Sequence, residues 1–200
     1  MDDRIISNIK NALASSAVSG ASCDVSDGRL VEKDMSTNEK VLLFEVRAGF
    51  SGSKVHIVDG DGSLKTILND IIGSDSSVMS ALQQASIDKI GDIKSLIADN
   101  CKYFGDGSLE ADRLFNVDVA ITDVTLAVAE TGSILIDPSD LAPRMKSLVC
   151  TKHIALIWAD QICSDLMDVS EYLGSLNSDE LPGGFNLISG PSKTADIELS

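Results

Sequence analysis

The stretch that most constrains the fold is residues 116–138, NVDVAITDVTLAVAETGSILIDP. Val117, Val119 and Ile121 alternate with Asp118, Ala120 and Thr122, which is the period of a β-strand with one drier face. Apolar residues on both sides of Glu130-Thr131-Gly132 continue that pattern. The stretch therefore predicts strands that flank a short polar segment.

This tripeptide admits two interpretations. A carboxylate between apolar strands is costly to bury without a partner, so Glu130 can begin a solvent-facing hairpin turn, as glycine-containing segments between strands commonly do. Alternatively, Glu130, Thr131 and Gly132 form a polar site at the end of a buried strand, where the glycine lets a ligand approach the backbone. The residues themselves leave both interpretations open.

The charge of the chain limits its partners. Sixteen lysines and arginines stand against 31 aspartates and glutamates, which gives a formal charge of −15. This charge repels phosphate backbones and anionic lipids at long range, so we expect no nucleic acid and no membrane among the partners. A local anion site remains possible because backbone amides act at short range. The acidic N-terminus is unlike a secretory signal and no stretch is apolar enough for membrane insertion, so a cytoplasmic location is expected.

The cysteines and histidines predict no metal site in this chain. Cys23, Cys101, Cys150 and Cys163 are scattered without a CxxC pair, and neither histidine belongs to an HxxH or HExxH motif. We therefore expect packed, reduced thiols and no cofactor bound by this chain. A lone histidine such as His153 is more often a structural residue than a catalyst.

We expect an N-terminal helix and loop in residues 1–35, followed by a single α/β domain in residues 36–200. Ile5, Ile9 and Leu13 recur every four residues and predict a helix over residues 3–16 with a narrow apolar stripe. The later patterns predict strands at 41–46, 55–58, 154–158 and 185–188 and helices at 64–72, 78–85, 92–103 and 162–173. This alternation is typical of an open, mostly parallel, Rossmann-like sheet.

A second polar segment follows the last predicted strand. Ser189-Gly190-Pro191-Ser192 leads to a predicted helix for which Thr194 is a suitable N-cap, and Asp196 in its first turn complements the helix dipole. The free amides and hydroxyls of such a loop either cap the helix or bind an anion or carboxylate.

Ligands bind beyond the carboxyl ends of strands in open parallel sheets. We therefore predict one ligand cleft in which Glu130, Thr131 and Gly132 face the second polar segment. Its predicted lining is completed by His153, Ser189, Gly190, Ser192, Thr194 and Asp196.

Taken together, four segments resemble the LUD domain family, and within it lactate-utilisation protein C. They are AVAETGSILI, SLVCTKHIALIWADQI, GFNLISG and SGPSKTADIE. The resemblance is strongest over residues 117–200, and it implies an α/β fold similar to the ribose-5-phosphate isomerase and coenzyme A transferase type. It also implies a role in the oxidation of L-lactate to pyruvate with two iron–sulfur partner proteins. Iron–sulfur clusters are accordingly expected in the partners.

The sequence departs from the family pattern at three places. Thr125 stands where an acid is expected, Cys150 stands where a proline is usual, and the chain stops at Ser200 where the family continues. We therefore expect the family's C-terminal tail to be absent.

Two functional hypotheses follow from the residues and the resemblance. The first is an accessory or structural subunit of a lactate-oxidising assembly, with a small carboxylate as a possible ligand. The alternative is a small-molecule or acyl-CoA binding enzyme of the transferase type, in which Glu130 is the catalytic nucleophile and forms an acyl intermediate.

Overall fold

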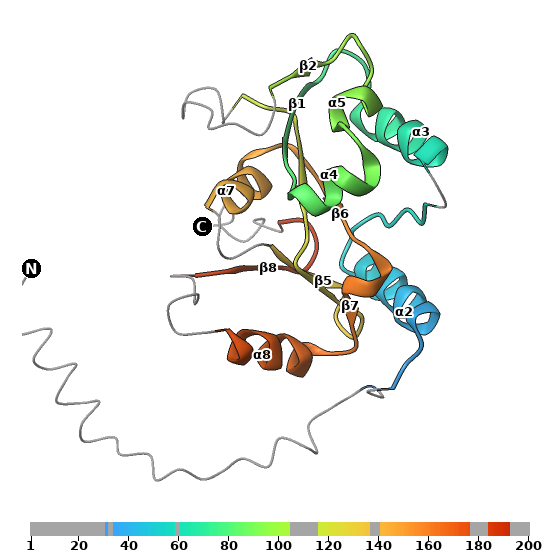
Figure 1. Ribbon diagram of the computed structural model, residues 1–200, viewed down its shortest axis with the longest axis vertical. Coiled ribbons are helices and arrows are strands. Elements are labelled where there is room, and N and C mark those ends of the chain that lie inside the picture. The colour runs from blue at the N-terminus through green and yellow to red at the C-terminus, as the bar shows by residue number, and fades with distance from the viewer. Residues whose placement is uncertain are drawn as a thin grey trace, which may run out of the picture.

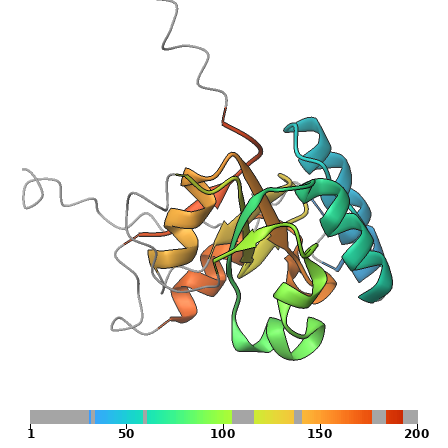
Figure 2. The ribbon, with the colours of Figure 1, turned by 90° about the horizontal axis from the view of Figure 1, so that it is seen from above.

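The fold is taken from a computed structural model of the chain, which describes residue 31 and residues 34–58, 61–104, 116–136, 141–176 and 184–192. The helices predicted for residues 3–16 and from Thr194 onwards lie outside the described residues. The described part contains two four-stranded sheets with helices packed against them (Figures 1 and 2).

The first sheet is parallel throughout, in the order β2-β1-β3-β6. Its strands are β1 (Ser77–Ala81), β2 (Lys102–Tyr103), β3 (Val119–Asp123) and β6 (Lys152–Leu156). Every residue of the inner strand β3 is buried, so both of its faces are covered and the single drier face predicted from its alternation is wrong. On one face Val119 and Ile121 pack against α3 (Asp61–Ile72) and α5 (Ile93–Leu96). On the other face Ala120 packs near the end of α7 (Leu141–Val149).

The second sheet is mixed, in the order β7-β4-β5-β8. Its strands are β4 (Leu126–Val128), β5 (Ser133–Ile136), β7 (Ile162–Cys163) and β8 (Asn186–Ile188). Strands β4 and β5 form an antiparallel hairpin, β8 runs antiparallel to β5, and β7 runs parallel to β4. The sequence after β3 therefore leaves the parallel sheet at once and builds a separate sheet below it (Figure 1).

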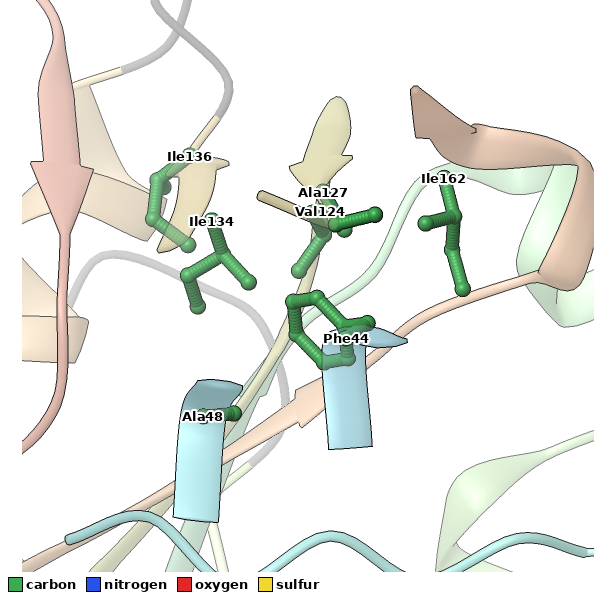
Figure 3. Close-up of a cluster of buried hydrophobic side chains, with 8 residues drawn as sticks. Phe44, Ala48, Val124, Ala127, Ile134, Ile136 and Ile162 are labelled. Carbon is green, nitrogen blue, oxygen red and sulfur yellow. The ribbon is translucent and has the colours of Figure 1, made fainter. Parts of the chain in front are cut away.

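Two helices cover the faces of this second sheet. Helix α2 (Thr37–Phe50) starts at a capping box in which Ser36 and Glu39 bond each other's backbone amides. One turn apart, Phe44 and Ala48 pack onto the sheet (Figure 3), where burial of the phenyl ring contributes about 1.5–3 kcal/mol. On the opposite face, α8 (Leu166–Ser175) contacts the sheet through Val169. The remaining elements are α4 (Gln84–Ile90) and the short 3-10 helix η2 (Ala159–Gln161).

The predicted α/β class with a mostly parallel sheet is confirmed, but the prediction of a single sheet is wrong. The strand predicted at 41–46 lies inside α2, because a short apolar run fits a buried helix as well as a strand. Residues 55–58 are not part of a strand either. The helix predicted at 64–72 is present and begins at Asp61.

Three predicted helix boundaries also need correction. The first half of the segment 78–85 is strand β1, with α4 beginning only at Gln84. The helix predicted at 92–103 is capped by Asp92 as expected, but it ends at Leu96 and the chain continues into β2. The helix predicted from 162 begins at Leu166, because residues 162–163 pair with β4 as strand β7.

Candidate functional site

The segment Ala129–Gly132 is the turn of the β4–β5 hairpin, so the hairpin interpretation is confirmed. Three backbone hydrogen bonds hold this turn: the amide of Ala129 donates to Cys163 O at 2.9 Å, that of Glu130 to Ser164 O at 3.0 Å, and that of Gly132 to Val128 O at 2.9 Å. The backbone of Glu130 is thereby held in the turn, and the residue is half-buried and not fully solvent-facing.

Gly132 fits this turn because it has no side chain. Its φ of +66° lies in the left-handed region that favours glycine. A Cβ atom at this position would lie 2.2 Å from the backbone nitrogen of Ala48 and 2.6 Å from the carbonyl carbon of Arg47. The hairpin turn thus packs directly against the backbone of the last turn of α2.

Gly190 makes a similar contact with the same end of α2. Its φ is +88°, and an added Cβ would lie 2.5 Å from the carbonyl oxygen of Ser51, the C-cap residue of the helix. The adjacent Pro191 side chain lies 3.4 Å from the corresponding position on Gly52. The end of α2 is therefore a common support for the two polar segments, which are far apart in the sequence.

A line of three hydroxyl groups joins the two segments. The Thr131 hydroxyl donates to Ser133 Oγ at 2.8 Å, and Ser133 Oγ lies 2.6 Å from Ser189 Oγ. Ser133 is 1% exposed, whereas Ser189 is exposed, so the line runs from the interior to the surface. The sequence predicted that Thr131 and Ser189 lie in one cleft, but Ser133 was not among the predicted residues. The feature that could have indicated it is the single hydroxyl residue in the apolar run SILI.

The remaining residues of the predicted cleft are only partly described. Ser192 is exposed, while Thr194 and Asp196 lie outside the described residues. The predicted approach of Glu130 to Thr194 and the binding of a ligand by these residues stay predictions.

His153 belongs to the parallel sheet and not to the hydroxyl line. It lies within β6, opposite Ala120 of β3, which corrects the expectation that it precedes its strand. Its Nε2 atom is 2.8 Å from Thr122 Oγ1. Burial lowers the pKa of His153 to about 4, so the imidazole is neutral at pH 7. Its observed contact is thus that of a structural, hydrogen-bonded histidine.

The carboxyl edge of the parallel sheet holds a second polar group that sequence reasoning did not single out. The chain leaves β1 towards β2 and leaves β3 towards β6, so the switch point of the sheet lies between β1 and β3. There the buried Asp123 accepts a hydrogen bond from the amide of Gln83, and the buried Lys146 donates to Ser80 O at 2.8 Å. The first contact ties the end of β3 to the residues that follow β1, and the second ties α7 to β1.

Thr125, where the resemblance led us to expect an acid, follows β3 and precedes β4 in the sequence. Its amide donates to Leu135 O at 2.8 Å, and among the described residues its buried hydroxyl has no hydrogen-bond partner. A buried hydroxyl without a partner costs about 1–3 kcal/mol.

The three described cysteines, Cys101, Cys150 and Cys163, are free and half-buried. Burial raises the pKa of Cys150, and burial together with nearby Asp168 raises the pKa of Cys163 to about 11. Across the part of the chain that the structure describes, no group of three or more histidine, cysteine or acidic side chains is placed to hold a metal ion. Within the same ranges, no helix has the length and apolar character needed to cross a membrane.

Fold and site together define an α/β protein in which two glycine-containing turns of a small mixed sheet meet at the end of one helix. The chain belongs to the LUD domain family, whose model matches residues 44–200. The matched span begins within α2 and includes both turns.

Several relatives share this similarity over about half of the chain. Lactate utilization protein C of Exiguobacterium sp. is 35% identical over 95 residues, which cover 46% of this chain and 41% of that protein. Lactate utilization protein C of Shouchella clausii is 32% identical over 94 residues, covering 46% and 40% respectively. The matched part of the chain thus spans less than half the length of these curated relatives.

A solved structure shows a similar fold. The crystal structure of a DUF162 family protein from Deinococcus radiodurans matches with a TM-score of 0.62, covering 78% of this chain and 90% of that one. At 22% sequence identity this likeness concerns the fold alone.

Proposed function

We propose that this chain acts in lactate utilisation, as an accessory subunit of an assembly that oxidises L-lactate to pyruvate with iron–sulfur partner proteins. The observation that carries the proposal is the LUD family match over residues 44–200, together with relatives named Lactate utilization protein C. Lactate loses two electrons and two protons on becoming pyruvate. In this proposal the clusters of the partner proteins accept the electrons.

The hydroxyl line is the proposed place for a small carboxylate. Ser189 lies at its surface end, where its hydroxyl can turn to donate to a carboxylate, and the Thr131 hydroxyl in the hairpin turn can do the same when it gives up its bond to Ser133. Glu130 in the same turn can accept a hydrogen bond or a proton from the α-hydroxyl group of lactate. In this pose hydroxyl groups of the protein donate to the carboxylate of lactate, and Glu130 accepts from its α-hydroxyl group.

A local cation strengthens the hold of an acidic chain on an anion, and Arg47 is the basic residue in the last turn of α2. Its backbone lies against Gly132 and its side chain is exposed. We therefore add Arg47 to the proposed site, although no sequence motif pointed to it.

Calorimetric titration of the purified chain with L-lactate and pyruvate tests this site. Ser189→Ala and Arg47→Gln should each weaken binding about tenfold, which corresponds to one lost charge-assisted hydrogen bond of about 1.4 kcal/mol. The matched controls are Ser95→Ala and Lys94→Gln, exposed residues of α5, which should leave binding unchanged. Absence of binding by the unmodified chain would reject the carboxylate site.

Co-purification tests the accessory role separately. The tagged chain, expressed together with its genomic neighbours, should carry cysteine-rich proteins and their iron through affinity and size-exclusion columns. If the purified chain alone converts lactate to pyruvate with an electron acceptor, the accessory role is wrong.

The alternative function is an acyl-CoA transferase-like enzyme. The feature that favours it is the position of Glu130 in a glycine-containing turn whose backbone is held by three hydrogen bonds, since a carboxylate nucleophile must be positioned to form an acyl intermediate. Glu130→Gln should abolish turnover of acyl-CoA without changing the melting midpoint. An unchanged rate, or no binding of acyl-CoA by the unmodified chain, removes this candidate.

Three structural expectations belong to the same proposal. We infer a fold of the ribose-5-phosphate isomerase and coenzyme A transferase type, one domain over residues 36–200, and a cytoplasmic location. The β4–β5 hairpin inserted between β3 and β6 of the parallel sheet supports the first. Limited proteolysis and cell fractionation test the second and third.

A further inference from the structure

Helix α2 carries a second apolar stripe on the side that faces away from the sheet. Leu42, Val46 and Phe50 recur every four residues and are 58%, 53% and 81% exposed. Phe44 and Ala48, which pack onto the sheet, lie on the opposite side of the helix. The helix is therefore apolar on two faces, and the described residues cover only one of them.

A helix with apolar residues on two opposite faces is normally covered on both, because each exposed large side chain forgoes about 1.5–3 kcal/mol of burial. An isolated apolar side chain on a surface needs no explanation, but three in one helical row form a continuous strip. Phe50 also lies in the turn of α2 that supports Gly132 and Gly190, so whatever covers the strip steadies the candidate site.

A second copy of the chain is a poor occupant. Two chains that each carry a formal charge of −15 repel one another. The strip offers three side chains, whereas a stable interface between proteins uses about 20–30 residues on each side. An intramolecular contact needs far less area because the partner is already tethered.

The N-terminal segment of the same chain fits the strip in spacing and charge. The pattern Ile5, Ile9 and Leu13, which predicts a helix over residues 3–16, repeats every four residues as the α2 strip does. Asp2 and Asp3 are balanced by Arg4 and Lys10, so the segment is not repelled by the acidic remainder of the chain.

The connection between the two is long enough for this contact. A helix of 14 residues, the length of α2, spans about 21 Å, and about 20 residues of extended chain reach roughly 65 Å. The segment that precedes α2 can therefore turn back and run along it.

We propose that residues 3–16 pack as an amphipathic helix across Leu42, Val46 and Phe50 of α2 and so hold the end of α2 against the two turns of the candidate site. This contact gives the N-terminal segment a structural role within the folded domain. It does not depend on the identity of the ligand.

Thermal unfolding of full-length variants tests the proposal, because it predicts the direction in which the melting midpoint changes. Glutamine is at least as good a helix former as valine, so Val46→Gln on an open surface should leave the melting midpoint unchanged or raise it. On a covered surface it should lower the midpoint by about 3–6 °C, as should Ile9→Gln. The double variant should lose clearly less than the sum of the two losses, because both remove the same contact.

The matched control is Ile57→Gln, since Ile57 is 54% exposed but lies outside the strip. Combined with Ile9→Gln, it should give an additive change. An unchanged or raised midpoint for Val46→Gln overturns the proposal, and so does additivity between positions 9 and 46. A molecular mass that doubles with concentration in light scattering, and that Val46→Gln returns to the monomer value, would assign the strip to a second copy instead.

Discussion

Replacing Gly132 by alanine tests the contact on which the candidate site depends. An alanine at φ +66° costs about 1–2 kcal/mol in backbone strain, since the left-handed region crowds Cβ. The added methyl would also lie 2.2 Å from the Ala48 nitrogen, and backbone cannot move aside as a side-chain tip does. Overpacking of this kind costs about 1–3 kcal/mol. The sum is about 2–5 kcal/mol.

For a chain of this size, each kcal/mol lowers the melting midpoint by roughly 2–4 °C, so Gly132→Ala should lower it by about 4–20 °C in scanning calorimetry. Gly174→Ala is the control: Gly174 lies in α8 with open space around it, and alanine there should be neutral or stabilising by up to about 1 kcal/mol. Equal midpoints for Gly132→Ala and the unmodified protein would refute the close packing of the hairpin turn on α2.

Three further outcomes can be measured on the same protein. Ser133→Ala removes the link between the Thr131 and Ser189 hydroxyls and should cost about 1 kcal/mol, read as a lower urea midpoint. The pKa of His153 is lowered to about 4 when folded, so the unfolded chain binds more protons between pH 4 and 6.5. Stability present above pH 6.5 should therefore be lost as the pH falls towards 4. The substitution His153→Gln should make the urea midpoint depend less on pH in this range. An identical pH dependence in both proteins would contradict the lowered pKa of His153. Because the pKa of Cys163 is raised to about 11, its alkylation in the native protein should be slow at pH 8 and about tenfold faster for each pH unit above that. Peptide mass spectrometry measures these rates. Full alkylation within minutes at pH 8 would contradict the burial of Cys163.

Much of the fold was predictable from local patterns. The strands around the central tripeptide, the strand that contains His153 and the last strand follow from alternation and apolar runs, which are properties of neighbouring residues. The strand wrongly predicted at 41–46 shows the limit of this reasoning, because an apolar run alone does not decide between strand and helix. The capping pair Ser36 and Glu39 was a readable signal for the helix and was overlooked.

The support of the site was not predictable in this way. Ala48 and Gly132 are 84 positions apart, and nothing in the sequence around either residue indicates that their backbones touch. The same holds for Ser133, whose hydroxyl gains its role only when β8 pairs with β5 and brings Ser189 alongside. Sequence reasoning found the two polar segments, and tertiary packing determines how they meet.

The rate of L-lactate oxidation by a reconstituted assembly tests the proposed function most directly. Iron–sulfur proteins that co-purify with the chain would be assayed with and without it, and pyruvate formation would be followed with an artificial electron acceptor. The account predicts that pyruvate forms only when the chain is present together with its partners, and that Arg47→Gln and Ser189→Ala reduce the rate at low lactate. Equal rates with and without the chain would contradict it.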